Sequence, residues 1–229
     1  MNNYVVECCS NSIKSALQGI LGGANRIEFC SNIETGGITP SREDISLLIK
    51  KIDIPLRVLI RPRSGNFIYS EEEILKMISD IKFCKSIGCE GVVIGALTKN
   101  GSINIKTTKR LIKAARPMHV TFHRAFDEGN NLNQNLEDVI ASGCDTLLTS
   151  GQKKNVKRGL NNLKVLIKIA NNRITILSGG GVNYKNAQDL YKVGVRNFHL
   201  SGNTKNKKGA LESSALLIKF LVKKLDEII

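Results

Sequence analysis

The sequence predicts a single (β/α)8 barrel of the TIM type, and three observations carry this prediction. Short runs rich in β-branched and apolar residues alternate with amphipathic stretches from one end of the chain to the other. No long linker or shift in composition divides the 229 residues, a length that suits one large domain. No G-x-G-x-x-G follows the first run, which disfavours an open doubly wound sheet. We therefore expect one barrel domain over residues 1–229.

Eight predicted strands each precede a predicted helix. The strands cover residues 5–8, 26–29, 56–60, 91–94, 119–122, 146–148, 174–177 and 197–200. The helices cover residues 12–21, 42–51, 71–87, 107–115, 133–141, 156–170, 187–193 and about 211–229. Two helices begin with a capping-box pattern, Ser41 before Asp44 and Ser70 before Glu73. Glycines at 22–23, 88, 143 and 194 precede the next strands, where helices commonly end. The long last helix has one apolar face.

Composition and charge restrict the cellular compartment and the binding partners that we expect for this protein. No apolar run approaches the roughly 18 residues of a membrane span, so we expect no membrane partner. The N-terminal residues lack a basic region followed by an apolar stretch, so we expect a cytoplasmic protein. The net charge of +14 is spread over most predicted helices, so nucleic-acid binding, which rests on charge alone, is only the third hypothesis for function, and we do not expect a nucleic-acid partner. Residues 146–188 include no acidic residue. A local positive field that favours an anionic ligand is therefore an open alternative for this stretch.

The pentapeptide E-x-C-S-N occurs twice, at residues 7–11 and 28–32, each time at the end of a predicted strand. Side chains alternate along a strand, so Glu7 shares a face with Cys9, and Glu28 shares a face with Cys30. Active sites of TIM barrels lie at the C-terminal ends of the strands. Two neighbouring strands therefore aim two carboxylates and two thiols at one point. Strand alternation favours Cys9 over Cys8 as the thiol that faces the barrel mouth.

Two further groups at strand ends have the chemistry to hold an anion. Arg61 and Arg63 flank Pro62 with the spacing that puts both on one face, and guanidinium groups bind carboxylate or phosphate. An ion pair with Glu7 and Glu28 is the alternative, compatible use of this pair. The glycine-rich turn that follows the seventh strand is a candidate anion site before a helix N-terminus, or a plain tight turn. Its residues are Ser178, Gly179, Gly180 and Gly181.

His123 points inward from the fifth strand, and Asp127 follows one helical turn later. His123 is a candidate general acid or base, a metal ligand, or a core histidine bonded to Glu28. His199, on the eighth strand, is interpreted as structural.

The six cysteines form no C-x-x-C pair and, in a cytoplasmic setting, we expect them to be reduced. Cys9 and Cys30 are candidates to bind Cu(I), or zinc, because thiolates are soft ligands. Their alternative is a pair of packed, reduced thiols. Cys84, Cys89 and Cys144 are interpreted as core residues.

Several motifs together resemble the CutC family, whose members are described as copper homeostasis proteins. The motifs are residues 22–30 (GGANRIEFC), 36–41 (GGITPS), 60–67 (IRPRSGNF), 95–98 (GALT), 120–127 (VTFHRAFD), 149–151 (TSG) and 179–182 (GGGV). This resemblance covers nearly the whole chain. It implies a cytoplasmic (β/α)8 barrel, often a homodimer, that is linked to copper through cysteines matching Cys9 and Cys30.

Two hypotheses about function follow. In the first, Cys9 and Cys30 bind Cu(I) as a copper homeostasis protein. In the second, the barrel is an enzyme for a small anionic metabolite, phosphorylated or carboxylated. There the arginines and the glycine turn hold the anion, Glu28 and His123 move protons, and Glu7 orients them, with Asp127 as a further catalytic candidate.

Overall fold

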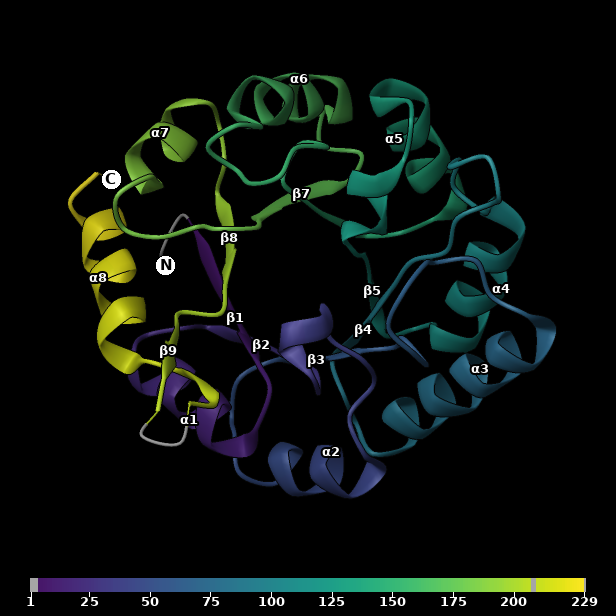
Figure 1. Cartoon of the computed structure of the whole chain (residues 1–229), viewed down its shortest axis with the longest axis horizontal. Helices are drawn as coiled ribbons and strands as arrows, with labels where there is room; N and C mark the ends of the chain where they lie inside the picture. Colours follow the sequence, from purple (N-terminus) through teal and green to yellow (C-terminus); the bar gives the residue numbers. More distant parts are fainter. Residues whose placement is uncertain (1–3, 207–208, 229) are drawn as a thin grey trace.

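Eight parallel strands close into a barrel in sequence order, as Figure 1 shows. The computed structural model describes residues 4–206 and 209–228. The barrel strands are β1 (Val5–Ser10), β2 (Arg26–Phe29), β3 (Leu56–Leu59), β4 (Gly91–Ile94), β5 (His119–Phe122), β6 (Thr146–Thr149), β7 (Thr175–Gly179) and β8 (Asn197–Leu200). Pairing of β1 with β8 closes the ring. The predicted (β/α)8 fold is confirmed.

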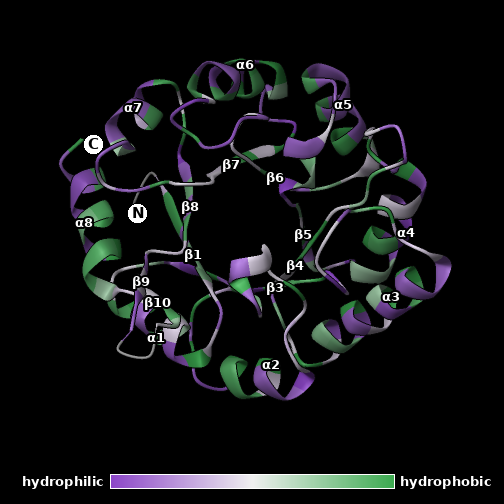
Figure 2. Ribbon diagram, in the orientation of Figure 1, coloured by the Kyte–Doolittle hydropathy of each residue, from purple (hydrophilic) through white to green (hydrophobic). Residues whose placement is uncertain are grey.

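A ring of helices surrounds the barrel (Figure 1). These helices are α1 (Ile13–Leu21), α2 (Arg42–Ile49), α3 (Glu71–Ser86), α4 (Ile105–Ala115), α5 (Leu132–Ser142), α6 (Leu160–Ala170), α7 (Ala187–Lys192) and α8 (Ala215–Asp226). Hydrophobic and hydrophilic residues alternate along them (Figure 2), as expected of helices with one face on a barrel. Helix α8 packs against both α1 and α7 and so completes the ring.

The last helix is shorter than the predicted span of 211–229. Residues Leu211–Ser213 form β10, which pairs antiparallel with β9 (Asn203–Lys205), and α8 begins only at Ala215. The backbone N–H of Ser213 also donates to the Ser15 hydroxyl of α1 at 3.1 Å. Contacts with distant residues therefore hold this segment as a strand, and the apolar spacing that predicted the helix begins only after it, at Leu216.

Most other boundaries differ from the prediction by one or two residues. The larger exception is α6, which begins at Leu160 because residues 151–159 form turns after β6. Strand β1 continues to Ser10. Glu7 and Cys9 therefore both lie within a regular strand, and the alternation of their side chains holds along its whole length.

The alternation along β1 separates an outer apolar layer from the barrel interior. Cys8 points outward against α1, where a Cβ on Gly19 would lie only 2.8 Å from its Sγ atom. Large side chains such as Phe29, Phe122 and Phe198 fill the same core cluster. Glu7 and Cys9 point the other way, into the barrel. This places Glu7 and Cys9 inside the ring of strands.

Candidate functional site

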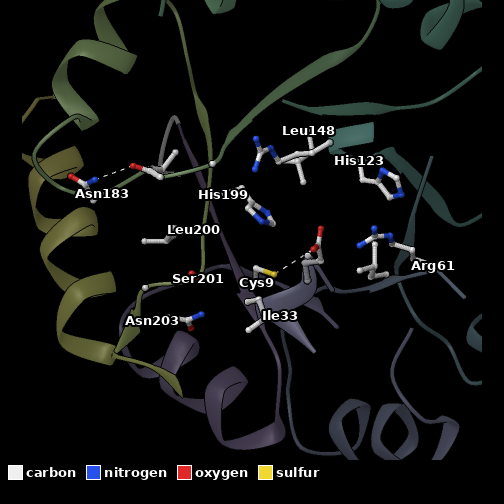
Figure 3. Close-up of a pocket in the computed structure, with 18 of the residues that line it drawn as sticks. Cys9, Ile33, Arg61, His123, Leu148, Asn183, His199, Leu200, Ser201 and Asn203 are labelled. Carbon is white, nitrogen blue, oxygen red and sulfur yellow. Dashed lines mark hydrogen bonds between the residues drawn. The ribbon is translucent and has the colours of Figure 1, made fainter. Parts of the chain in front are cut away.

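A cavity of about 430 Å³ opens at the C-terminal ends of the strands, where TIM barrels carry their active sites. Figure 3 shows side chains from opposite sides of the barrel reaching into it. Its wall combines residues of β1, β2 and β8 with the loops that follow β3, β5 and β7. The polar side chains and glycines at this wall include Cys9, Glu28, Arg61, His123, Arg124, Gly180, Gly181 and His199. The size suits one small molecule.

Glu7 lies in the barrel interior, is fully buried, and is surrounded by cations. It accepts hydrogen bonds from Arg26 Nε at 2.5 Å and His199 Nδ1 at 2.7 Å, and Arg57 lies 3.9 Å away. Burial by itself would raise the pKa of Glu7, but these positive charges outweigh it and lower the pKa below its usual range. Glu7 is therefore a fixed negative charge. It orients His199, whereas the sequence suggested that it orients His123.

His199 is the site residue that the sequence analysis missed. The pairing of β1 with β8 places it directly opposite Glu7. Burial would lower the pKa of His199, but the carboxylates of Glu28 and Glu7 outweigh this effect and raise it. Its Nε2 atom makes no hydrogen bond to a described residue, and the side chain lines the cavity. Its position at the end of a barrel strand was the signal that could have identified it.

Glu28 lies beside Cys9, its partner in the β1–β2 register. Glu28 is only 4% exposed, and one of its carboxylate oxygens accepts a hydrogen bond from the Cys9 thiol at 3.5 Å. The other oxygen, Oε2, is buried without a partner among the described residues. Burial raises the pKa of Glu28, and the charge of Glu7 adds to the rise. The side chain therefore resists ionisation unless a cation or a ligand approaches.

The two candidate thiols lie together, with 3.8 Å between Cys9 Sγ and Cys30 Sγ. Cys9 lines the cavity, whereas Cys30 lies behind it in a small cluster with Leu59 and Val93. The hydrogen bond with Cys30 and burial raise the pKa of Cys9 well above its usual range. The Cys9 thiol is therefore protonated until a metal ion displaces the proton.

This pair fits a soft metal ion. Two sulfur ligands of one ion at bond lengths of roughly 2.3 Å lie roughly 3.8 Å apart when the angle between the bonds is near tetrahedral, and the Cys9–Cys30 separation is 3.8 Å. The donor set is soft, as Cu(I) prefers. Cys9, Glu28 and His199 also bring one ligand atom each within 4.8 Å of one another. Either group of residues is able to hold a metal.

Arg61 and Arg63 do not act as a pair. Arg61 turns into the loops, where it donates to the carbonyls of Gly37 at 2.9 Å and Gly65 at 2.7 Å. Its Nε atom, buried at the edge of the cavity, has no partner among the described residues. Arg63 lies outside the cavity lining and pairs with Glu73 of α3 at 2.6 Å. Only Arg61 is in place to meet a ligand, and neither arginine pairs with Glu7 or Glu28.

His123 is a neutral hydrogen-bond donor in this site. Its Nδ1 atom accepts from the backbone N–H of Ala125 at 3.1 Å, which leaves the proton on Nε2. That Nε2 atom is buried without a partner among the described residues. Burial and the charge of Arg61 lower the pKa of His123 to about 3. At neutral pH the ring is therefore uncharged, and its Nε2–H group is able to donate to a ligand.

Asp127 lies away from the cavity lining and holds a loop in place. Its carboxylate accepts from Arg124 Nε at 2.7 Å and from the backbone N–H groups of Ser150 and Gln152, each at 3.0 Å. Asp127 is in the segment η2 (Arg124–Glu128) and so fixes the turn after β6. With these bonds in place its carboxylate does not face a ligand.

The glycine turn after β7 contributes Gly180 and Gly181 to the cavity lining. Both have positive φ angles, 101° and 89°, which favour glycine. A Cβ on Gly180 would also approach the Arg124 guanidinium to 3.0 Å. Gly179 ends β7, and the Ser178 hydroxyl is buried without a described partner. Helix α7 starts at Ala187, as predicted, and residues 182–186 separate its N-terminus from the turn.

Fold and cavity together define a class: a TIM-barrel protein with a cavity at the C-terminal ends of its strands. Within this class the chain belongs to the CutC family, because the sequence model described as "CutC family" matches residues 4–204. The resemblance seen in the motifs is thereby confirmed. Among the described residues, no helix is long and apolar enough to cross a membrane.

Relatives and solved structures agree with this assignment. The Bacteroides fragilis protein named as family protein CutC is 43% identical over 211 residues, which cover 91% of this chain and 84% of that protein. The Histophilus somni relative is 44% identical over 200 residues, which cover 87% of this chain and 82% of that protein. The solved structure of CutC from Streptococcus agalactiae, whose name proposes copper homeostasis, superposes with a TM-score of 0.82. It is 30% identical and covers 86% of this chain and 98% of that one.

More distant barrels show the fold alone. One of them is the thiamine phosphate pyrophosphorylase of Pyrococcus furiosus, with a TM-score of 0.66 and 15% identity, over 100% of this chain and 98% of that one.

Proposed function

We propose that this chain is a copper homeostasis protein that binds Cu(I) through Cys9 and Cys30. The observation that carries the proposal is the 3.8 Å separation of the two sulfur atoms at the inner end of the cavity. Thiolates select Cu(I) over hard cations, and Cys9 offers an approach from the cavity. The name of the Streptococcus agalactiae relative points to the same ion.

A competition titration tests this proposal. Under reducing, oxygen-free conditions, we expect the protein to take close to one equivalent of Cu(I) from a coloured chelator. The double variant Cys9→Ala/Cys30→Ala loses this binding. Cys84→Ala/Cys89→Ala is the matched control, since both of those thiols are also buried but lie outside the cavity lining. Unchanged Cu(I) binding in the Cys9/Cys30 variant would sink the proposal.

A second candidate function is an enzyme for a small anionic metabolite, carboxylated or phosphorylated. It is favoured by three buried atoms without described partners at the wall of one cavity: Glu28 Oε2, Arg61 Nε and His123 Nε2. Unpaired buried polar atoms are rare in proteins, and a ligand is one way to satisfy them. Arg61 and the Gly180–Gly181 turn would hold the anion, His123 would donate to a carbonyl oxygen, and Glu28 would transfer a proton.

Thermal shifts in inorganic phosphate or sulfate test this second function. We expect either anion to raise the Tm, and Arg61→Ala to remove the shift. Arg63→Ala is the matched control, because Arg63 neighbours Arg61 in the sequence but lies outside the cavity lining. The absence of a shift with either anion, or its persistence in Arg61→Ala, would count against this function.

The setting that we propose is the cytoplasm, with the protein as a homodimer. All six cysteines are free, which suits a reducing compartment.

For the dimer, α8 exposes Leu216 and Phe220, and the Phe220 ring lies 5.6 Å from that of Tyr184. Light scattering should give the mass of two chains. Phe220→Glu should give one chain, and a monomeric mass for the unmodified protein would contradict the proposal.

A further inference from the structure

Three adjacent strands of the closed barrel bring different metal-binding groups to one point. Cys9 comes from β1, Glu28 from β2 and His199 from β8, and their ligand atoms all lie within 4.8 Å of one another. Cys9 and His199 both reach into the cavity in Figure 3. Cys30 is not part of this group, although its sulfur atom lies 3.8 Å from that of Cys9.

Two of the three groups have free coordinating atoms. Glu28 is 4% exposed, and its Oε2 atom has no partner among the described residues, which is costly for a buried carboxylate. His199 donates from Nδ1 to Glu7 at 2.7 Å, and its Nε2 atom makes no hydrogen bond to a described residue. Metal-binding histidines typically show this arrangement, in which a carboxylate binds one ring nitrogen and the metal binds the other.

We propose that Cys9, Glu28 and His199 form a three-ligand site for a divalent transition metal of the zinc type. One sulfur, one oxygen and one nitrogen ligand suit borderline ions such as Zn²⁺ and Co²⁺, whereas Mg²⁺ and Ca²⁺ require oxygen ligands. The distance of 3.5 Å between Cys9 Sγ and the nearer Glu28 oxygen already fits. It is close to the separation of two tetrahedral ligands with bonds of roughly 2.3 and 2.0 Å.

Residues around the three ligands provide two further features of a reactive metal centre: a fixed histidine ring and an open ligand position. Glu7 orients His199 and is itself held by Arg26 at 2.5 Å, so the imidazole cannot turn freely. The fourth ligand position faces the cavity of about 430 Å³. Three protein ligands with one open position are typical of catalytic zinc, whereas structural zinc has four protein ligands. The open position would accept a water molecule or an oxygen atom of a small molecule bound in the cavity.

This inference shares Cys9 with the proposed Cu(I) site but does not rest on it, because it requires Glu28 and His199 in place of Cys30. A Cys30→Ala variant therefore separates the two proposals. It should lose tight Cu(I) binding and keep the divalent site.

Cobalt substitution tests the site. After the protein is stripped of metal with a chelator under reducing conditions, Co²⁺ alone is titrated while the absorption spectrum is recorded. We expect one equivalent to produce the intense visible bands of a four-coordinate ion together with a thiolate-to-cobalt band in the near ultraviolet. Zn²⁺ should displace the Co²⁺ and raise the Tm of the protein, as a ligand of the native state does.

The variants assign the ligands. Cys9→Ala should lose the thiolate band, and Glu28→Gln and His199→Gln should each weaken Co²⁺ binding. Glu7→Gln leaves all three ligands in place and should weaken Co²⁺ binding by about 10–100-fold, as loss of a carboxylate that orients a metal-binding histidine does. Circular dichroism checks that each variant is folded. A thiolate band that survives in Cys9→Ala, a band lost in Cys30→Ala, or no stoichiometric Co²⁺ binding by the unmodified protein would each overturn the proposal.

Discussion

The two copies of E-x-C-S-N lie side by side on β1 and β2, yet their glutamates are in opposite electrostatic states. Glu7 has Arg26, His199 and Arg57 around it, and its pKa is lowered. Glu28 accepts one hydrogen bond from a thiol, and its pKa is raised. The two copies differ only at their second residue, Cys8 or Phe29, so the difference comes from the neighbouring strands. Strands β2, β3 and β8 supply the cations that Glu7 meets.

This contrast divides the site into a fixed layer and a responsive layer. The fixed layer is Glu7 with its cationic partners Arg26, Arg57 and His199, which hold its carboxylate ionised inside the barrel. The responsive layer is Cys9, Glu28, Cys30 and the cavity side of His199, where donor atoms lack partners or hold displaceable protons. A ligand or metal ion gains most by binding to the responsive layer, because there it satisfies groups that burial leaves unpaired.

The largest effect expected from this contrast is that of Glu7→Gln on stability. Removing the carboxylate charge leaves Arg26 buried without a counter-charge and takes the charged partner of His199 away, which should lower the free energy of unfolding by about 3–5 kcal/mol. Urea denaturation followed by circular dichroism measures this change. Because the pKa of Glu7 is lowered in the folded state, the difference from the unmodified protein is fully present above about pH 4.3 and shrinks as the pH falls below it. A loss below 1 kcal/mol at neutral pH would show that Glu7 is not the anchor of this layer.

The second largest effect is expected when either thiol is replaced by serine, and the loss of stability should differ between Cys9 and Cys30. Cys30 is 1% exposed beside Leu59 and Val93, so a hydroxyl in Cys30→Ser would be buried, with an expected loss of about 1–3 kcal/mol. Cys9 faces the cavity, where water can solvate the new hydroxyl of Cys9→Ser, and we expect a loss of less than about 1 kcal/mol. Denaturation of both metal-free variants under the same conditions makes the comparison. Equal losses would contradict the assignment of only Cys9 to the cavity.

Glu28→Gln should have a smaller effect, and its sign should depend on pH. Near pH 4 the carboxyl of Glu28 is protonated in the folded chain, so we expect a change of about 1 kcal/mol or less. As the pH rises above about 4.3, the unfolded chain ionises Glu28 freely while the folded chain resists, so the unmodified protein loses stability relative to the variant. Melting temperatures of both proteins in chelator, measured across this range, test the trend. A variant whose relative stability falls with rising pH would show that Glu28 is ionised and paired.

The smallest effect is expected at His123, whose protonation state should not change around neutral pH. Its pKa of about 3 keeps the imidazole neutral, so its NMR signals should stay constant between about pH 5 and 8. His199 lies beside two carboxylates that raise its pKa, so it should be protonated in the metal-free protein in the lower part of that range. Isotope-labelled protein, with His123→Gln and His199→Gln as assignment controls, separates these two signals from that of His119, the third histidine. Titration of His123 near neutral pH would restore it as a candidate proton carrier.

Much of this arrangement was predictable from the sequence. Alternating apolar runs and amphipathic stretches predicted the closed barrel, since both patterns follow from backbone periodicity alone. Strand alternation predicted that Cys9 and not Cys8 faces inward, as the structure places it. The rule that TIM barrels work at the C-terminal ends of their strands led to Glu28, Arg61 and His123.

Other features depended on contacts between residues far apart in the chain. Arg63 and Asp127 are of a suitable residue type and follow barrel strands. Arg63, however, pairs with Glu73, and Asp127 accepts hydrogen bonds from the loop after β6, so neither faces a ligand. His199 joins the site only because β8 closes against β1 and puts it opposite Glu7. The sequence by itself determined the barrel and the faces of its strands, because these depend on local periodicity. Only the tertiary structure decided which charges are paired and which stay open to a ligand, because pairing depends on the register between strands that are distant in the chain.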